Sequence, residues 1–275
     1  MTHIISNQRT ALKPLLFALL ALSYLFVSAQ ETGAFPWPDG KTMAISLTWD
    51  DGRKSQVETG TPLLDKYGVK ATFYVVPSLV EEALPGWQTA VKNGHEIGNH
   101  SLLHPCSGNF LWAREVALEE YTLARMNEEL GKANEKVRQL LNVTPTEFAY
   151  PCGQTFVGRG RETQSYVPLV TDRFVSGRTW LDEVPNDPAY CDLAQLTGVE
   201  MDGKDFDEIK ALIETARKDG LWLILAGHDI GEKNIQTTEV EMLNRLLPYL
   251  QDPANGIWVA PVGEISAYVK EKRGL

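Results

Sequence analysis

Short apolar runs alternate with amphipathic segments along most of the chain. Residues 43–49 alternate apolar with small or polar side chains and predict a strand, which ends at Asp50-Asp51-Gly52. Residues 221–226 form a continuous apolar run, typical of a parallel strand covered on both faces. Further strands are predicted over 71–76, 96–100, 147–150, 174–179 and 257–259, and helices over 56–67, 87–92, 112–141, 206–219, 239–250 and 262–272. These repeated strand–helix units predict an α/β fold, either a (β/α) barrel or a doubly wound sheet.

The longest predicted helix, 112–141, carries an apolar seam. Val116, Leu123, Leu130 and Val137 recur every seven residues, and a companion row runs alongside them. The companion row consists of Met126, Ala133 and Leu140. Such a stripe predicts a helix that lies on the sheet or barrel of its own domain. A coiled-coil partner is the alternative.

The N-terminus has the features of a secretory signal peptide. Arg9 and Lys13 precede an apolar run over 15–27, and Val27-Ser28-Ala29 offers small residues at a cleavage site. The run is shorter than the roughly 18–20 residues of a membrane span, which argues against the alternative of a membrane anchor. We therefore expect a signal peptide at 1–29, a single domain over 30–275, secreted or periplasmic localisation, and no stable membrane insertion after cleavage.

Composition and net charge limit the kinds of molecule that the chain is expected to bind. Lys and Arg number 26 against 36 Asp and Glu, so the net charge of -10 argues against nucleic acid as a partner. A hydrophobic fraction of 43% is ordinary for a globular protein. The three cysteines, Cys106, Cys152 and Cys191, imply at least one unpaired thiol or an intermolecular bridge, and their spacing fits no zinc ribbon.

Polar clusters follow four of the predicted strands. They are Asp50-Asp51, the pair His100 and His104, Pro151-Cys152-Gly153, and His228-Asp229. The carboxyl ends of barrel strands converge on one face, so these clusters are expected to meet there. Taken alone, Asp-Asp-Gly is most often a turn and a His-x3-His pair is most often at the surface. Their joint position at strand ends is what predicts a site.

Two imidazoles and one carboxylate suit zinc or a similar divalent ion. Of the adjacent Asp50 and Asp51, one can bind the metal while the other faces the substrate. A metal-bound water becomes a nucleophile near neutral pH, and the free carboxylate can take its proton. His228 could then protonate the leaving group from the opposite side.

Several of these segments resemble the motifs of a known family. Residues 48–52, 94–105, 148–153 and 225–228 resemble the first, second, third and fifth motifs of the polysaccharide deacetylases, the NodB-homology carbohydrate esterases of family 4. The resemblance implies a distorted (β/α) barrel. It also implies site roles, with Asp51, His100 and His104 as metal ligands, Asp50 as general base, His228 as general acid, the Cys152 N–H as an oxyanion donor, and Tyr150 and Trp180 as substrate contacts. Zinc is the favoured metal, with cobalt, manganese and nickel as alternatives.

The chain departs from the family pattern at three points. Ala149 stands where an arginine usually braces the catalytic aspartate, Cys152 replaces an aromatic residue, and the fourth motif is unclear, with Trp180 and Asp182 as its nearest candidates. We hypothesise that an arginine from a later loop reaches Asp50 instead. The candidates are Arg159, Arg161 and Arg178, with Arg161 and Arg178 favoured.

The predicted function is removal of acetyl groups, N- or O-linked, from a carbohydrate polymer or oligomer by attack of a metal-bound water. The expected partner is thus an acetylated polysaccharide or oligosaccharide. A catalytically silent carbohydrate-binding barrel that retains the metal site is the first alternative, motivated by the missing arginine. A hydrolase of another amide, such as a cyclic imide, is the second.

Overall fold

A parallel sheet forms the centre of the computed structural model, which describes residues 35–180 and 184–275. The sheet order is β7-β4-β3-β2-β1-β9-β8, and β12 pairs with the first half of β1. Its strands are β1 Met43–Trp49, β2 Thr72–Val75, β3 Glu96–Asn99, β4 Glu147–Ala149, β7 Ser176–Arg178, β8 Val199–Glu200, β9 Trp222–Gly227 and β12 Ile257–Val259. The predicted strands are therefore confirmed, and the short β8 is an addition.

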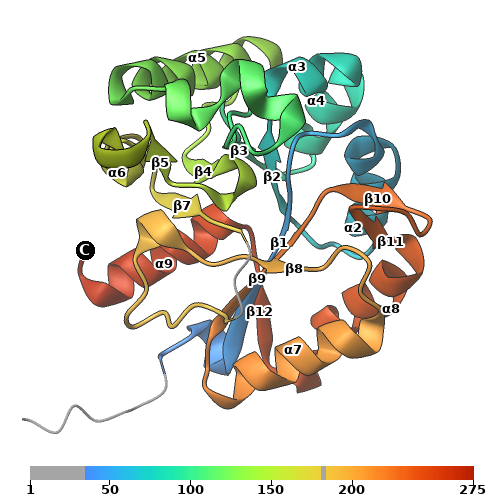
Figure 1. Cartoon of the computed structure of the whole chain (residues 1–275). Helices are drawn as coiled ribbons and strands as arrows, with labels where there is room; N and C mark the ends of the chain where they lie inside the picture. The colour runs from blue at the N-terminus through green and yellow to red at the C-terminus, as the bar shows by residue number, and fades with distance from the viewer. Residues whose placement is uncertain (1–34, 181–183) are drawn as a thin grey trace, which may run out of the picture. The chain divides into compact units, whose positions relative to one another are not determined.

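The sheet curls until its two edges meet. Arg178 of β7 forms a bridge with Leu196, just before β8, and Thr179 N donates to the Leu196 carbonyl over 2.7 Å. This closure gives the distorted (β/α) barrel expected from the sequence rather than an open doubly wound sheet. Figure 1 shows α5 on one side of the strands and α7 and α8 on the other.

Helices pack against both faces of the sheet. They are η2 Gln56–Gly60 running into α2 Thr61–Lys66, α3 Pro77–Glu82, α4 Leu84–Lys92, α5 Leu123–Leu141, α6 Val167–Arg173, α7 Phe206–Lys218, α8 Val240–Gln251 and α9 Val262–Arg273. Alternate residues of β1, such as Ile45 and Leu47, lie in the main apolar core with side chains of α7 and α8. The residues between them face the other way, where Ala44 packs with α9. Within the described segments, no helix has the length and apolar character that crossing a membrane needs.

The prediction of one helix over 112–141 is wrong at its start. Residues 111–120 form two 3₁₀ turns, η3 Leu111–Val116 and η4 Leu118–Glu120, and α5 begins only at Leu123. Ala117 between the turns is extended, because Leu118 N donates to the Cys106 carbonyl over 3.0 Å, and Thr122 caps α5 by accepting from Arg125 N. The seam from Met126 to Val137 is buried and packs against α3, α4 and β3, as expected for a helix on its own domain.

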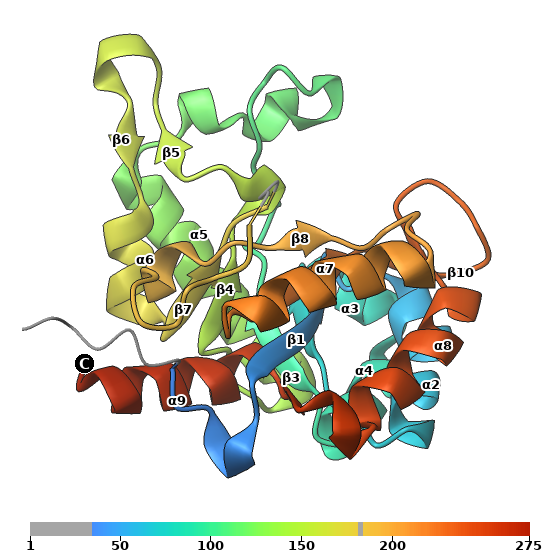
Figure 2. The same cartoon turned by 90° about the horizontal axis from the view of Figure 1, so that it is seen from below.

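Two small β-ribbons lie outside the sheet. β5 Phe156–Val157 pairs with β6 Gln164–Ser165, and β10 Asp229–Gly231 pairs with β11 Thr237–Glu239. Gly158 N donates to the Leu118 carbonyl, so the β5–β6 hairpin lies beside η4 (Figure 2). The predicted signal peptide, 1–29, and Asp182 lie outside the described residues.

Candidate active site

The polar clusters at the ends of the predicted strands meet in one cleft of about 610 Å³. Asp50 and Asp51 come from the end of β1, His100 and His104 from the loop after β3, and His228 from the end of β9. Cys152 and Gly153 of the turn η5, Pro151–Gly153, line the same cleft, as does Trp180. The expected convergence is therefore confirmed.

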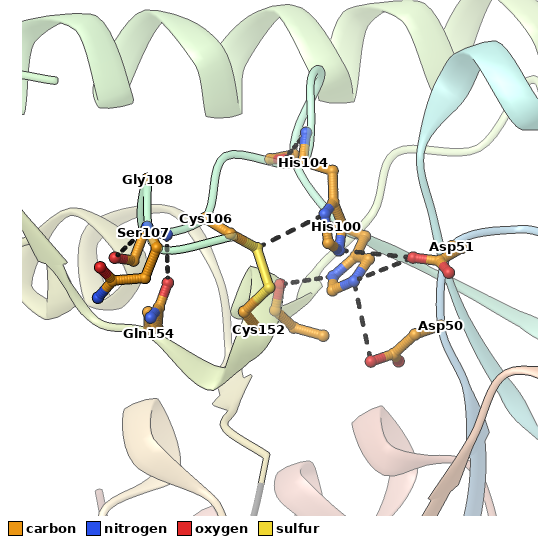
Figure 3. The surroundings of a disulfide bond; sticks show 12 residues. Asp50, Asp51, His100, His104, Cys106, Ser107, Gly108, Cys152 and Gln154 are labelled. Carbon is orange, nitrogen blue, oxygen red and sulfur yellow. Dashed lines mark hydrogen bonds and ion pairs between the residues drawn. A yellow bond between two sulfur atoms is a disulfide. The ribbon is translucent and has the colours of Figure 1, made fainter. Parts of the chain in front are cut away.

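Three side chains form a candidate metal centre (Figure 3). Asp51 Oδ1 lies 3.6 Å from His100 Nε2 and 3.5 Å from His104 Nε2. Two ligand atoms about 2.05 Å from a tetrahedral zinc ion lie roughly 3.4 Å apart, so the observed distances are those of a set that can close on one ion. The donor set and its spacing thus fit a divalent metal.

Other groups orient these three ligands. The His100 Nδ1–H donates to the Ala149 carbonyl over 2.9 Å, which leaves the Nε2 lone pair directed toward Asp51. Arg53 Nε donates to Asp51 Oδ2 over 2.9 Å, so Oδ1 remains for the imidazoles. Such outer contacts fix ligand geometry before a metal binds.

The loop that carries the two histidines is a tight turn rather than a helix. Ser101 and His104 have positive φ angles of 64° and 53°. Side chains stabilise this backbone, because Ser101 N donates to Asn99 Oδ1 and His104 N donates to Ser101 Oγ. The His-x3-His spacing therefore places both imidazoles on one side through loop geometry.

Charge and burial suit a metal at this position. Burial, together with the neighbouring His100, lowers the pKa of His104 to about 4, so its imidazole is neutral near pH 7 and able to ligate. Burial alone would raise the pKa of Asp51, but His100, His104 and Arg53 outweigh it and the pKa falls below its usual value. The carboxylate is therefore ionised.

Asp50 is buried beside the metal centre and is paired with an arginine. Arg178 Nη2 donates to Asp50 Oδ1, and both side chains are almost fully buried. The other oxygen, Oδ2, lies 3.8 Å from His100 Nε2, so it faces the metal centre. The hypothesis that a later arginine replaces the missing one is confirmed for Arg178, whereas Arg159 pairs with Glu120 at the surface.

His228 is paired with an aspartate that sequence reasoning missed. Asp202 Oδ2 lies 2.8 Å from His228 Nδ1, and its Oδ1 accepts from Thr238 Oγ1 over 2.7 Å. Burial alone would lower the pKa of His228, but Asp202, with Asp50 and Asp51, raises it above its usual value. Asp202 follows the two-residue β8, which gave no strand signal, and the sequence pointed instead to Trp180 and Asp182.

Gln56 joins the two ends of the site and was also missed. Its Nε2 donates to the Asp50 carbonyl and, over 2.8 Å, to the His228 carbonyl. Gln56 opens the π-helical turn η2, where the hydrogen-bonding span is wider than in an α-helix. A single side-chain amide therefore bridges the carboxyl ends of β1 and β9, which the β-ladder already holds side by side.

Both predicted substrate contacts, Tyr150 and Trp180, line the cleft. Trp180 lines the cleft with its ring 4.7 Å from that of His228. Tyr150 is buried, and its hydroxyl donates to the Ala194 carbonyl over 2.8 Å. On the rim of the cleft, Phe110 and Trp112 are 43% and 62% exposed, which leaves two apolar rings facing solvent.

A disulfide joins two loops of the site. Cys106 and Cys152 are bonded, and Cys191 is the free cysteine. The bond ties the histidine loop to the turn whose Cys152 N–H is the predicted oxyanion donor (Figure 3). The odd cysteine count thus resolves into one internal bridge and one unpaired thiol.

Comparisons with known proteins agree with the fold and the motifs. Residues 38–163 match the family model described as polysaccharide deacetylase. Chitin deacetylase 1 of Cryptococcus neoformans is 26% identical over 222 residues, or 79% of this chain and 43% of that protein. A gellan lyase of a Bacillus species is 25% identical over 262 residues, or 86% of this chain and 10% of that protein. The chain thus spans less than half the length of these curated relatives.

Solved structures show the same fold. A family 4 acetyl xylan esterase from Clostridium thermocellum, in complex with a cobalt ion, superposes with a TM-score of 0.54 at 21% identity, covering 82% of this chain and 91% of that chain. The resemblance expected from the motifs is confirmed, because residues 38–163 match the polysaccharide deacetylase model.

Proposed function

We propose that this chain is a metal-dependent hydrolase that removes acetyl groups from an acetylated polysaccharide or oligosaccharide. One observation carries the proposal. A single cleft brings together an arginine-paired carboxylate, a three-ligand metal centre and an aspartate-paired imidazole. These are the groups that acyl-transfer hydrolysis needs, namely a base, an electrophile and an acid.

Asp51, His100 and His104 are the residues that would hold the metal, and zinc is the favoured ion. When bound, a divalent ion would polarise the acetyl carbonyl and increase the acidity of water near it. The Clostridium structure with cobalt supports the choice of a divalent transition metal.

The chain's own residues supply the proton transfers. Asp50 accepts the proton of the attacking water through Oδ2, since Arg178 occupies Oδ1. The Cys152 N–H donates to the oxyanion that forms on the acetyl carbonyl. His228 then donates its proton to the departing amine or alcohol, while Asp202 fixes the opposite ring nitrogen.

Sugar is the substrate class that the cleft rim favours. The exposed rings of Phe110 and Trp112 offer flat apolar surfaces of the kind on which pyranose rings stack. The names of the chitin deacetylase and the acetyl xylan esterase support acetylated glycans as substrates. The motive for a silent barrel was a missing arginine, and Arg178 now supplies that group.

We further propose that the protein is exported. The signal-like segment at 1–29 motivates this, and the disulfide between Cys106 and Cys152 supports an oxidising compartment.

Acetate release tests the proposed function. Zinc- or cobalt-loaded protein is incubated with chitin oligomers, acetylated xylan and peptidoglycan, and free acetate is measured. We expect turnover on at least one glycan, and no acetate from any of them would favour the silent barrel.

The two aspartates provide the matched pair of variants. Asp51→Asn should lose the metal, whereas Asp50→Asn should keep it and lose roughly 10²–10⁴-fold in rate, as expected for a missing general base. Metal content by elemental analysis separates the two. Loss of metal from Asp50→Asn with retention in Asp51→Asn would reverse the assigned roles.

A further inference from the structure

The His104 imidazole lies between two groups of potential metal ligands. Its Nε2 is 3.5 Å from Asp51 Oδ1, and its Nδ1 is 3.7 Å from Cys106 Sγ on the other side (Figure 3). The ligand atoms of His104, Cys106 and Cys152 all lie within 4.8 Å of one another. In the oxidised protein the two sulfurs are bonded to each other, and neither is available as a thiolate.

We propose that, when this disulfide is open, Cys106, Cys152 and His104 Nδ1 form a zinc-class site that competes with the Asp51–His100–His104 centre. Cysteine thiolate and imidazole are ligands that zinc and cobalt prefer. A nitrogen about 2.1 Å and a thiolate about 2.3 Å from a tetrahedral ion lie roughly 3.6 Å apart. The observed 3.7 Å between Nδ1 and Sγ is already close to that separation.

The loops should stay together when the disulfide opens. Ser107 N donates to Gln154 Oε1 over 2.7 Å, which links the cysteine-bearing loops independently of the sulfurs. Glu119 accepts from Ser107 Oγ and from Gly108 N, fixing the same segment against η4. The two thiols would therefore remain near His104.

Competition follows from the chemistry of the imidazole. A neutral ring has one lone pair, so a metal on Nδ1 places the proton on Nε2, which then donates to Asp51 instead of binding the first metal. Binding of the ion by the cysteines releases their two thiol protons. His104 can thus serve only one of the two centres at a time, and this step rests on the proposed ligand role of Asp51 and His100.

The open form needs no special reductant, because the newly made chain carries both cysteines as thiols. The disulfide then forms by exchange with a disulfide oxidant, which takes two electrons and leaves as two thiols. Formation of the bond removes both soft ligands and leaves His104 Nε2 for the carboxylate-containing centre. Disulfide formation would therefore direct the metal to the proposed catalytic position.

Cobalt spectroscopy tests the proposal on the full chain. Oxidised protein and protein reduced with dithiothreitol, freed of reductant under anaerobic conditions, are each titrated with Co²⁺. Reduction should produce a near-ultraviolet thiolate-to-cobalt charge-transfer band that the oxidised protein lacks. Identical spectra in both states would overturn the proposal.

Three variants identify the side chains that give rise to the charge-transfer band. His100→Ala should bind little Co²⁺ when oxidised and one equivalent with the band when reduced, and absence of the band there would also refute the site. The double variant Cys106→Ser, Cys152→Ser should lack the band in both states, and Cys191→Ser should keep it. A band that survived the double variant would arise elsewhere and refute the assignment.

The proposed acetyl-hydrolase function and the proposed thiolate site are tested by separate measurements. Acetate release by oxidised, metal-loaded wild-type protein reports on that function. The charge-transfer band of reduced His100→Ala reports on the thiolate site alone.

Discussion

Replacement of Arg178 by methionine should test how strongly the interior depends on its ion pair with Asp50. Both side chains are buried, and Arg178 also lies over the Tyr74 and Trp180 rings at 5.0 and 5.2 Å. Removing one member of a buried pair leaves an uncompensated charge, which costs roughly 3–5 kcal/mol of unfolding free energy. We expect Arg178→Met to lose about that amount in urea unfolding at pH 7.

A double-mutant cycle isolates the pair itself. Arg178→Met leaves the Asp50 carboxylate buried without its partner, and Asp50→Asn removes that charge. The double variant should therefore lose less stability than the sum of the single variants, by about 2 kcal/mol or more. Arg159→Met is the matched control, because its pair with Glu120 is exposed and should contribute no more than about 1 kcal/mol. Additivity of the Arg178 and Asp50 effects to within about 0.5 kcal/mol would refute the reasoning.

Three further predictions concern pH and substrate. Asp202→Asn removes a group that raises the pKa of His228, so the alkaline limb of the rate profile should move to lower pH, and an unmoved limb would contradict the pairing. Burial, together with Glu96, raises the pKa of Glu147 to about 8, so the folded protein binds a proton that the unfolded chain releases near its usual 4.5. Unfolding free energy should therefore fall as pH rises from about 4.5 to 8, and Glu147→Gln should flatten that slope in urea melts. Trp112→Ala should raise KM roughly 2- to 10-fold with kcat little changed. Leu111, its neighbour outside the cleft, is even more exposed, and Leu111→Ala should leave KM unaltered.

Periodic patterns made most of the fold predictable. The strands at 43–49 and 221–226 follow from residue spacing alone, and the helix predicted over 206–219 matches α7, which begins with a capping box of Asp205 and Glu208. The start of α5 was not predictable in this way, because the break at Ala117 depends on a contact between Leu118 and Cys106. A hydrogen bond that depends on the tertiary fold cannot be predicted from the local sequence pattern.

The site was predictable where its residues sit at ends of recognisable strands. Asp50, His100 and His228 satisfy that condition, whereas Asp202 follows a strand of two residues. Gln56 acts through its side-chain amide on a carbonyl 172 positions away, which no spacing rule anticipates. Arg178 emerged only as one of three arginines, since sequence cannot tell which loop turns inward.

Gln56 begins a π-helical turn that runs directly into α2, so the number of residues between Gln56 and α2 is constrained. Most connecting segments accept insertions and deletions. Here, removal of one residue from the turn after Gln56 would rotate α2 by about 100° relative to Gln56, as one residue does in a helix. The amide that joins the Asp50 and His228 carbonyls could not then keep both contacts while α2 stayed packed in the core. Loop-length variation near this helix would therefore remove a bridge between the backbones of the proposed base and acid, even with every cleft side chain retained.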